Sequence, residues 1–119
     1  MTWHTLGERA RRLPAPPHIV RADLAAARTD GLRAWLDLAR DVQAPQVVDG
    51  TAGELIWSGL WPGEPRVRVR FTVESAGSDT QLRFVIESPT PIEDPSRIGH
   101  YRRRINELLW RDLRASYGQ

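Results

Sequence analysis

The chain contains neither cysteine nor lysine, and these two absences exclude several kinds of chemistry. Without cysteine there is no disulfide, no thiolate nucleophile and no cysteine-ligated metal. Without lysine, Schiff-base catalysis and lysine-dependent phosphate loops are excluded as well. All 17 basic residues are arginines, yet the net charge is only +2. Because the charges nearly balance, the pI of about 9.9 is weak support for nucleic-acid binding, and no nucleic-acid partner is expected.

Long hydrophobic runs are missing too. No apolar stretch reaches the length of a membrane span, and the first residues, MTWHTLGERARRLP, lack the apolar core of a signal peptide. We therefore expect a cytoplasmic protein with no membrane partner. The 119 residues, 40% hydrophobic and 27% charged, fit one globular domain spanning residues 1–119.

Motifs for metals and cofactors are also lacking. The three histidines, His4, His18 and His100, form no helical metal-binding motif. Neither a glycine-rich nucleotide loop nor a G-x-S-x-G nucleophile elbow is present. The sequence therefore predicts no metal site and no cofactor.

Hydrophobic periodicity predicts an α+β fold, with an antiparallel sheet of about five strands packed on a long C-terminal helix. Residues 1–13 are expected to form an edge strand, which the PAPP at 14–17 ends because proline fits poorly inside a strand. Two short helices follow this first strand. The helices are expected at 18–28, 32–40 and 94–118, and the other strands at 46–49, 54–61, 66–74 and 81–88.

The strand RVRVRFTVE alternates apolar and basic side chains, so one face is buried and the other carries an arginine stripe. Two registers with its partner QLRFVIES keep the apolar faces together. One sets Phe71 opposite Phe84 and, further along, Arg68 opposite Glu87, whereas the other sets two arginines against each other. Charge favours the first register. We interpret the stripe as a solvated outer face; the alternative, a nucleic-acid surface, lacks interleaved aromatic residues.

The C-terminal helix starts at Asp94 and Pro95, since aspartate caps a first turn and proline suits the first helical position. At about 100° per residue, its apolar face holds Ile98, Tyr101, Ile105, Leu108, Leu109 and Ser116. Asp112 falls about 20° from the centre of that face. A carboxylate that points into a core must be paired or neutralised, so Asp112 requires an explanation.

Three interpretations of Asp112 stay open. It accepts hydrogen bonds from an arginine, a tryptophan N–H or backbone groups; it is a cavity acid that orients a ligand or transfers a proton; or the helix rolls and leaves it in solvent. Tyr101, about 16 Å away along the same face, either lies in the core with a satisfied hydroxyl or holds a ligand at the other end of a cavity. Trp57 is interpreted as core and Trp61 as a rim residue.

The chain resembles the START-like, or SRPBCC, superfamily. The likeness lies in the order of its elements and in three segments, PAPPHIVRADLAAARTDGLRAWLDL, LIWSGLWP and DLRASYGQ. The likeness is greatest to small bacterial members near the polyketide cyclase and heat-shock-chaperone-activator branches. It covers essentially the whole chain but includes no catalytic signature. It implies a helix-grip fold, in which a curved antiparallel sheet wraps the C-terminal helix around a cavity for an apolar or amphipathic molecule. Relatives usually carry an additional hairpin, so the smaller sheet here leaves an exposed edge, and a homodimer is one expectation.

The resemblance and the residues together predict a START-like domain that binds an apolar or aromatic small molecule between the sheet and the C-terminal helix. The expected ligand-binding residues are Trp57, Trp61, Phe71, Phe84, Tyr101, Ile105 and Leu108, with Asp112 as a polar anchor. Two alternatives stay open. One is a cyclase- or dehydratase-type enzyme with Asp112 as its catalytic acid–base, and the other is a protein-interaction module without a ligand cavity.

Overall fold

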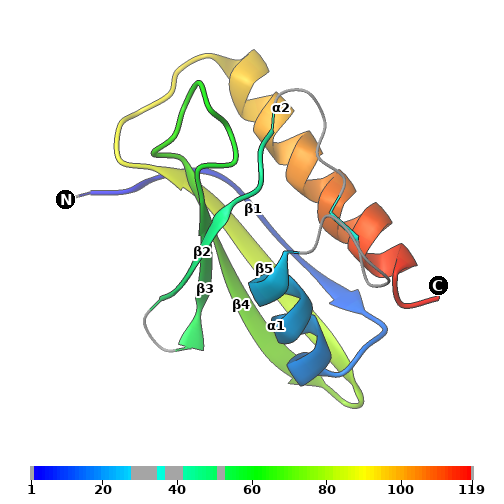
Figure 1. Cartoon of the computed structure of the whole chain (residues 1–119). Helices are drawn as coiled ribbons and strands as arrows, with labels where there is room; N and C mark the ends of the chain where they lie inside the picture. Colours follow the sequence, from blue (N-terminus) through cyan, green and yellow to red (C-terminus); the bar gives the residue numbers. More distant parts are fainter. Residues whose placement is uncertain (1, 28–34, 37–41, 51–52, 119) are drawn as a thin grey trace.

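The computed structural model describes residues 2–27, 35–36, 42–50 and 53–118 of the chain. A sheet and a long C-terminal helix make up most of the molecule, as Figure 1 shows. The second short helix, expected at 32–40, falls outside the described residues apart from Trp35 and Leu36, which are both buried. Among the described residues, no helix is both long and apolar enough to cross a membrane.

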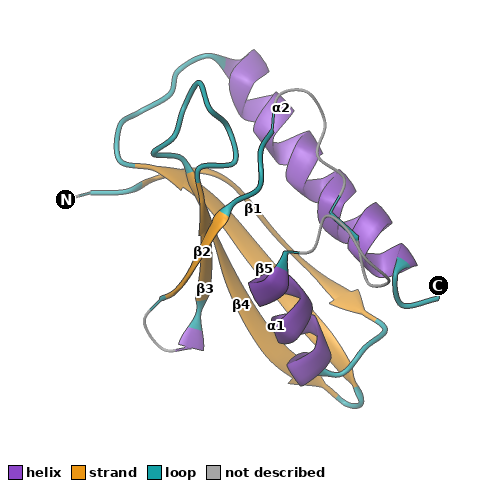
Figure 2. Ribbon diagram, viewed as in Figure 1, coloured by secondary structure: helices purple, strands orange, loops and turns teal. Residues whose placement is uncertain are grey.

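Within the described ranges, five strands form one antiparallel sheet in the order β1-β5-β4-β3-β2 (Figure 2). Their bounds are His4–Leu13 (β1), Gln46–Asp49 (β2), Leu55–Ser58 (β3), Arg68–Ala76 (β4) and Asp79–Ser88 (β5). The expected number of strands and the edge position of the first strand are confirmed. β2 forms the other edge, and its Val48 is exposed. The homodimer expected from such an edge stays a prediction.

The hairpin of β4 and β5 has the register that charge favours. Phe71 lies opposite Phe84 and Arg68 opposite Glu87, as expected. Alternate apolar residues of both strands are buried in the core, whereas the arginines lie on the other face of the sheet. The hairpin turns at Gly77, whose φ of 65° is a left-handed conformation that glycine adopts without strain.

Two α-helices are described. The helix α1, Pro17–Ala26, has proline at its first position, and α2, Pro95–Asn106, begins directly after Asp94. The carboxylate of Asp94 accepts a hydrogen bond from the backbone N–H of Ser96 at 2.9 Å, which confirms the expected helix start. Beyond Asn106 the helix continues as a π-helical segment, Glu107–Leu113 (η2).

The π-helical segment changes which residues face the core. A π-helix has i→i+5 hydrogen bonds, so each residue advances less around the axis than in an α-helix. Leu108 and Leu113, five residues apart, are both buried, as this wider turn requires. In an uninterrupted α-helix Leu113 would lie on the flank and Asp112 near the centre of the apolar face. In the structure Leu113 takes the inward position, and Asp112 lies at the margin with 17% of its side chain exposed.

The strand β3 ends at Ser58, whereas the sequence pattern extends to Trp61. Gly59 has a φ of 77°, and this left-handed residue turns the chain out of the sheet. Trp57 therefore lies on β3, while Trp61 lies in the connection between β3 and β4. Both rings are buried, but in different places, because the ring of Trp61 packs on Tyr101 of α2.

Candidate functional site

A cleft of about 370 Å³ opens between the β3–β4 connection and the first two turns of α2, which lie beside each other in Figure 1. Its lining residues are Trp61, Gly63, Glu64, Ser96, Arg97, His100 and Tyr101. Pockets for small molecules typically measure about 300–1,000 Å³. The cleft therefore has the size of a site for a small organic molecule.

Two aromatic rings form the apolar wall of this cleft. The ring centroids of Trp61 and Tyr101 lie 4.3 Å apart at an interplanar angle of 40°. The connection is held in place by a tight turn, in which the Glu64 N–H donates to the backbone oxygen of Trp61 at 2.9 Å. The Trp61 Nε1–H is buried and meets no acceptor among the residues that the structure describes. This side of the cleft thus consists of two packed and largely buried rings, and Trp61 carries one donor that the described residues leave unused.

The rim of the cleft carries charged groups. Arg97 and Glu64 form an ion pair that joins the helix to the connection. The Arg97 side chain is well exposed and that of Glu64 partly so. Arg97 also lies in the first turn of α2, where the helix dipole is positive. The ring of His100 lies 6.3 Å from that of Tyr101. The arrangement suits a planar apolar body with hydrogen-bond acceptors at one end.

Five of the expected ligand-binding residues lie in the core. They are Trp57, Phe71, Phe84, Ile105 and Leu108, each at most 1% exposed. Trp57 packs edge-on against Phe71, with centroids 4.8 Å apart, and its N–H donates to the backbone oxygen of Leu24 at 2.9 Å. All five belong to the hydrophobic core of the fold. Of the expected residues, the structure brings Trp61 and Tyr101 to the cleft.

Asp112 lies near the opposite end of the helix from the cleft. Its Oδ1 accepts a hydrogen bond from Arg111 Nε at 2.9 Å. Its Oδ2 is buried and has no donor within the described part of the chain. Arg111 is 60% exposed and also pairs with Glu107 at 3.4 Å. The carboxylate is thus held by a neighbouring arginine at the surface, which is one of the interpretations the sequence leaves open.

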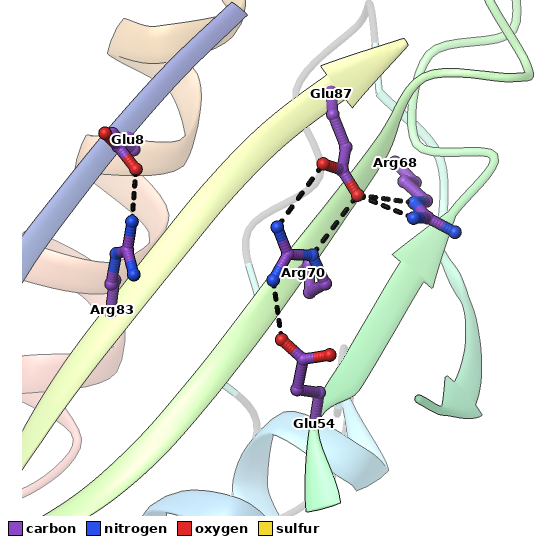
Figure 3. A network of polar contacts seen from close by, with 6 residues as sticks. All are labelled: Glu8, Glu54, Arg68, Arg70, Arg83 and Glu87. Atoms are coloured by element: carbon purple, nitrogen blue, oxygen red, sulfur yellow. Dashed lines mark hydrogen bonds and ion pairs between the residues drawn. The ribbon is translucent and has the colours of Figure 1, made fainter. Parts of the chain in front are cut away.

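The outer face of the sheet carries a network of charged side chains, drawn in Figure 3. Glu87 accepts hydrogen bonds from Arg68 at 2.7 Å and from Arg70 at 3.3 Å. Arg70 also donates to Glu54 at 2.6 Å. These hydrogen bonds, to Glu54 first and Glu87 second, raise the pKa of Arg70 above its ordinary value. Arg68 and Arg70 of the arginine stripe therefore pair with Glu87 of β5 and with Glu54, which directly precedes β3.

A groove of about 660 Å³ runs over this network. Trp3 is one of its lining residues, and the centroid of its ring lies 3.6 Å from the guanidinium carbon of Arg68. Each charged group that lines the groove has an opposite charge as partner, including Asp49, which pairs with Arg21 at 3.3 Å. Strand alternation predicts the pair of Arg68 with Glu87, but Trp3 precedes β1 and carries no such signal. We therefore interpret the charged residues that line this groove as ion pairs that stabilise the sheet.

Asp23 is a buried carboxylate outside the expected site. It lies on α1, and its Oδ2 accepts a hydrogen bond from the hydroxyl of Tyr117 at 2.9 Å. The sequence holds a signal for this burial, because Asp23 follows Val20 by three positions and so shares the apolar side of the helix. The contact joins α1 to the C-terminal residues of the chain.

Comparison with known proteins adds the class of fold. No family model matches the chain, and no curated protein matches it. Among solved structures, the crystal structure of Ara h 8.0201 matches with a TM-score of 0.55, at 14% sequence identity, over 98% of this chain and 97% of that chain. The chain has a Bet v 1-like helix-grip fold, and the expected α+β fold class is confirmed. At this identity the likeness shows the fold alone.

Proposed function

We propose that the chain is a small START-like binding domain that holds an apolar or aromatic small molecule in the cleft beside the C-terminal helix. The observation that carries this proposal is the pair of buried rings, Trp61 and Tyr101, in the wall of the cleft. Proteins with the helix-grip fold in general accommodate small hydrophobic molecules, which supports the same assignment.

In this proposal the two rings provide the contact surface for the ligand. A planar ring that packs on them gains from burial of apolar area and from offset stacking, which contributes about 0.5–1.5 kcal/mol per aromatic pair. Asp112 does not line the cleft, so no observation favours the cyclase or dehydratase alternative.

The proposal is tested by titrating the protein with 2-naphthamide, a neutral planar probe, and following the indole N–H signals by NMR. We expect the signal of Trp61 to shift, and Trp61→Leu to weaken binding about tenfold or more, because the main stacking surface is lost. The matched control is Trp3→Leu, which removes a tryptophan from the outer face of the sheet and should leave the affinity unchanged.

Ser96→Trp gives a second test that leaves the buried rings in place. Ser96 is exposed at the rim, so a large side chain there fills the cleft from outside. We expect this variant to lose the probe while its unfolding midpoint stays close to that of the unaltered chain. Equal affinity in the unaltered, Trp61→Leu and Ser96→Trp proteins, or no binding to any of them, would contradict the proposal.

A further inference from the structure

We propose that the cleft prefers aromatic molecules that carry a carboxylate group, an inference that rests on the proposed function. In the structure a carboxylate, that of Glu64, already pairs with Arg97 at the rim. Arginine binds carboxylates through charge-assisted and often bidentate hydrogen bonds. A carboxylate on a ligand that stacks against Trp61 and Tyr101 takes the place of Glu64 beside Arg97.

The exchange of one carboxylate for another needs little reorganisation. Arg97 is exposed and Glu64 partly exposed, and ion pairs in such positions contribute little to stability. Glu64 follows Gly63 in the connection, and its backbone N–H is already satisfied by the Trp61 oxygen at 2.9 Å. Its side chain can therefore turn into solvent while the backbone stays in place, and Arg97 keeps a negative partner throughout.

Other features of the same rim favour a negative charge with oxygen acceptors. Ser96 and Arg97 occupy the first turn of α2, a helix of 12 residues whose positive end is capped by the Asp94 carboxylate through the Ser96 N–H, so the positive charge open to a ligand at the rim is that of Arg97. The Nε1–H of Trp61, a residue that lines the cleft, is buried and finds no acceptor in the described ranges of the chain, and a ligand oxygen that reached it would supply one. An amine placed beside Arg97 would meet a like charge, which disfavours cationic ligands in this position.

The experiment compares 2-naphthoate with 2-naphthamide at pH 7, since the two probes share a ring system and differ in charge. Binding of each is measured by calorimetric titration. We expect the acid to bind about tenfold more tightly, the effect of one charge-assisted hydrogen bond. Arg97→Gln should make the two affinities equal. Arg103→Gln removes the same charge from the same helix outside the cleft and should preserve the preference.

Glu64→Gln provides the reverse test. Because this change removes the competing carboxylate from Arg97, we expect 2-naphthoate to bind more tightly and 2-naphthamide to bind as before. Equal affinities of the two probes for the unaltered protein, or a preference that survives Arg97→Gln, would overturn the inference while leaving the proposed function intact. Failure of both probes to bind would overturn both.

Discussion

Two carboxylates of this chain, Glu87 and Asp112, pair with arginines in different surroundings. The Glu87 side chain is 5% exposed and is shared by Arg68 and Arg70, which are themselves largely covered. Asp112 pairs with Arg111, whose side chain extends into solvent. The penalty for removing one member of an ion pair depends on how far the other is shielded from water. The two sites should therefore respond very differently to the loss of a negative charge.

Glu87→Gln should lower the free energy of unfolding by about 2 kcal/mol, because it leaves two partly buried arginines without their common anion. The raised pKa of Arg70 means that its stabilisation is complete below the ordinary arginine pKa and is lost only above it. Urea denaturation at pH 7 therefore measures the full effect.

The matched control for Glu87 is Glu8, which pairs with Arg83 on the same face of the sheet. Both members of that pair are about half exposed, so Glu8→Gln should change stability by less than about 0.5 kcal/mol. Similar losses in the two variants would show that exposure does not separate the two ion pairs.

Asp112→Asn should change the free energy of unfolding by less than about 1 kcal/mol, since Arg111 stays hydrated when its partner is neutralised. Chemical denaturation at neutral pH measures the difference. A loss of several kcal/mol would mean that the variant strands a buried positive charge. It would then make Asp112 a structural residue of the core.

At the scale of elements, the sequence predicts most helices and strands but not two of their ends: the end of β3 and the point where α2 becomes a π-helix. Strand alternation and charge predict the register of β4 and β5, and Asp94 with Pro95 predicts the start of α2. The end of β3 depends on the left-handed conformation of Gly59, which glycine permits without requiring it. The change to a π-helix follows from tertiary packing, because it brings Leu113 into the core. Neither change leaves a periodic signal in the sequence.

The helix α2 offers a site for stabilisation at Gly99. This glycine is exposed, its φ is not positive, and an added Cβ would meet nothing within 4 Å. Gly99→Ala should raise the free energy of unfolding by about 0.5–1 kcal/mol, because alanine loses less backbone entropy on helix formation.

The control for Gly99 is Gly77, at the turn between β4 and β5. Its φ of 65° strains any side chain, so Gly77→Ala should lower stability by about 1 kcal/mol. Thermal unfolding followed by circular dichroism measures both variants. A shift of the midpoint in the same direction for both substitutions would show that backbone conformation does not decide the effect of alanine at these two glycines.

At the scale of the whole molecule, the cleft shows why the site was only partly predictable. The residue types of Trp61 and Tyr101 predict both as ligand contacts, but the distance between their rings depends on the turn at Gly59 and on the position of α2 relative to the sheet. Arg97 and Glu64 were not expected at the site, since each looks like an ordinary surface charge until the fold brings them together. Proximity of this kind arises from topology and leaves no trace in local spacing.

The two ends of the chain are both tied into the fold, so unfolding should be a single cooperative transition. β1 pairs along its length with β5, and Tyr117 is hydrogen-bonded to Asp23 of α1. We expect tryptophan fluorescence and far-ultraviolet circular dichroism to give the same urea midpoint, as two-state unfolding requires. Separate midpoints would show that the edge strand or the C-terminal helix unfolds on its own.

The pairing of β1 with β5 also sets the order of events during synthesis. His4 lies opposite Ser88, so the first strand has to wait for a partner that leaves the ribosome only after most of the chain has been made. Until then the apolar side of the sheet is uncovered, and the helix α2 that covers it follows β5 in the chain and so is translated later still. The sheet can therefore be completed and covered only after β5 and α2 have both left the ribosome, and we expect the nascent chain to need chaperones that shield unpaired strands until then.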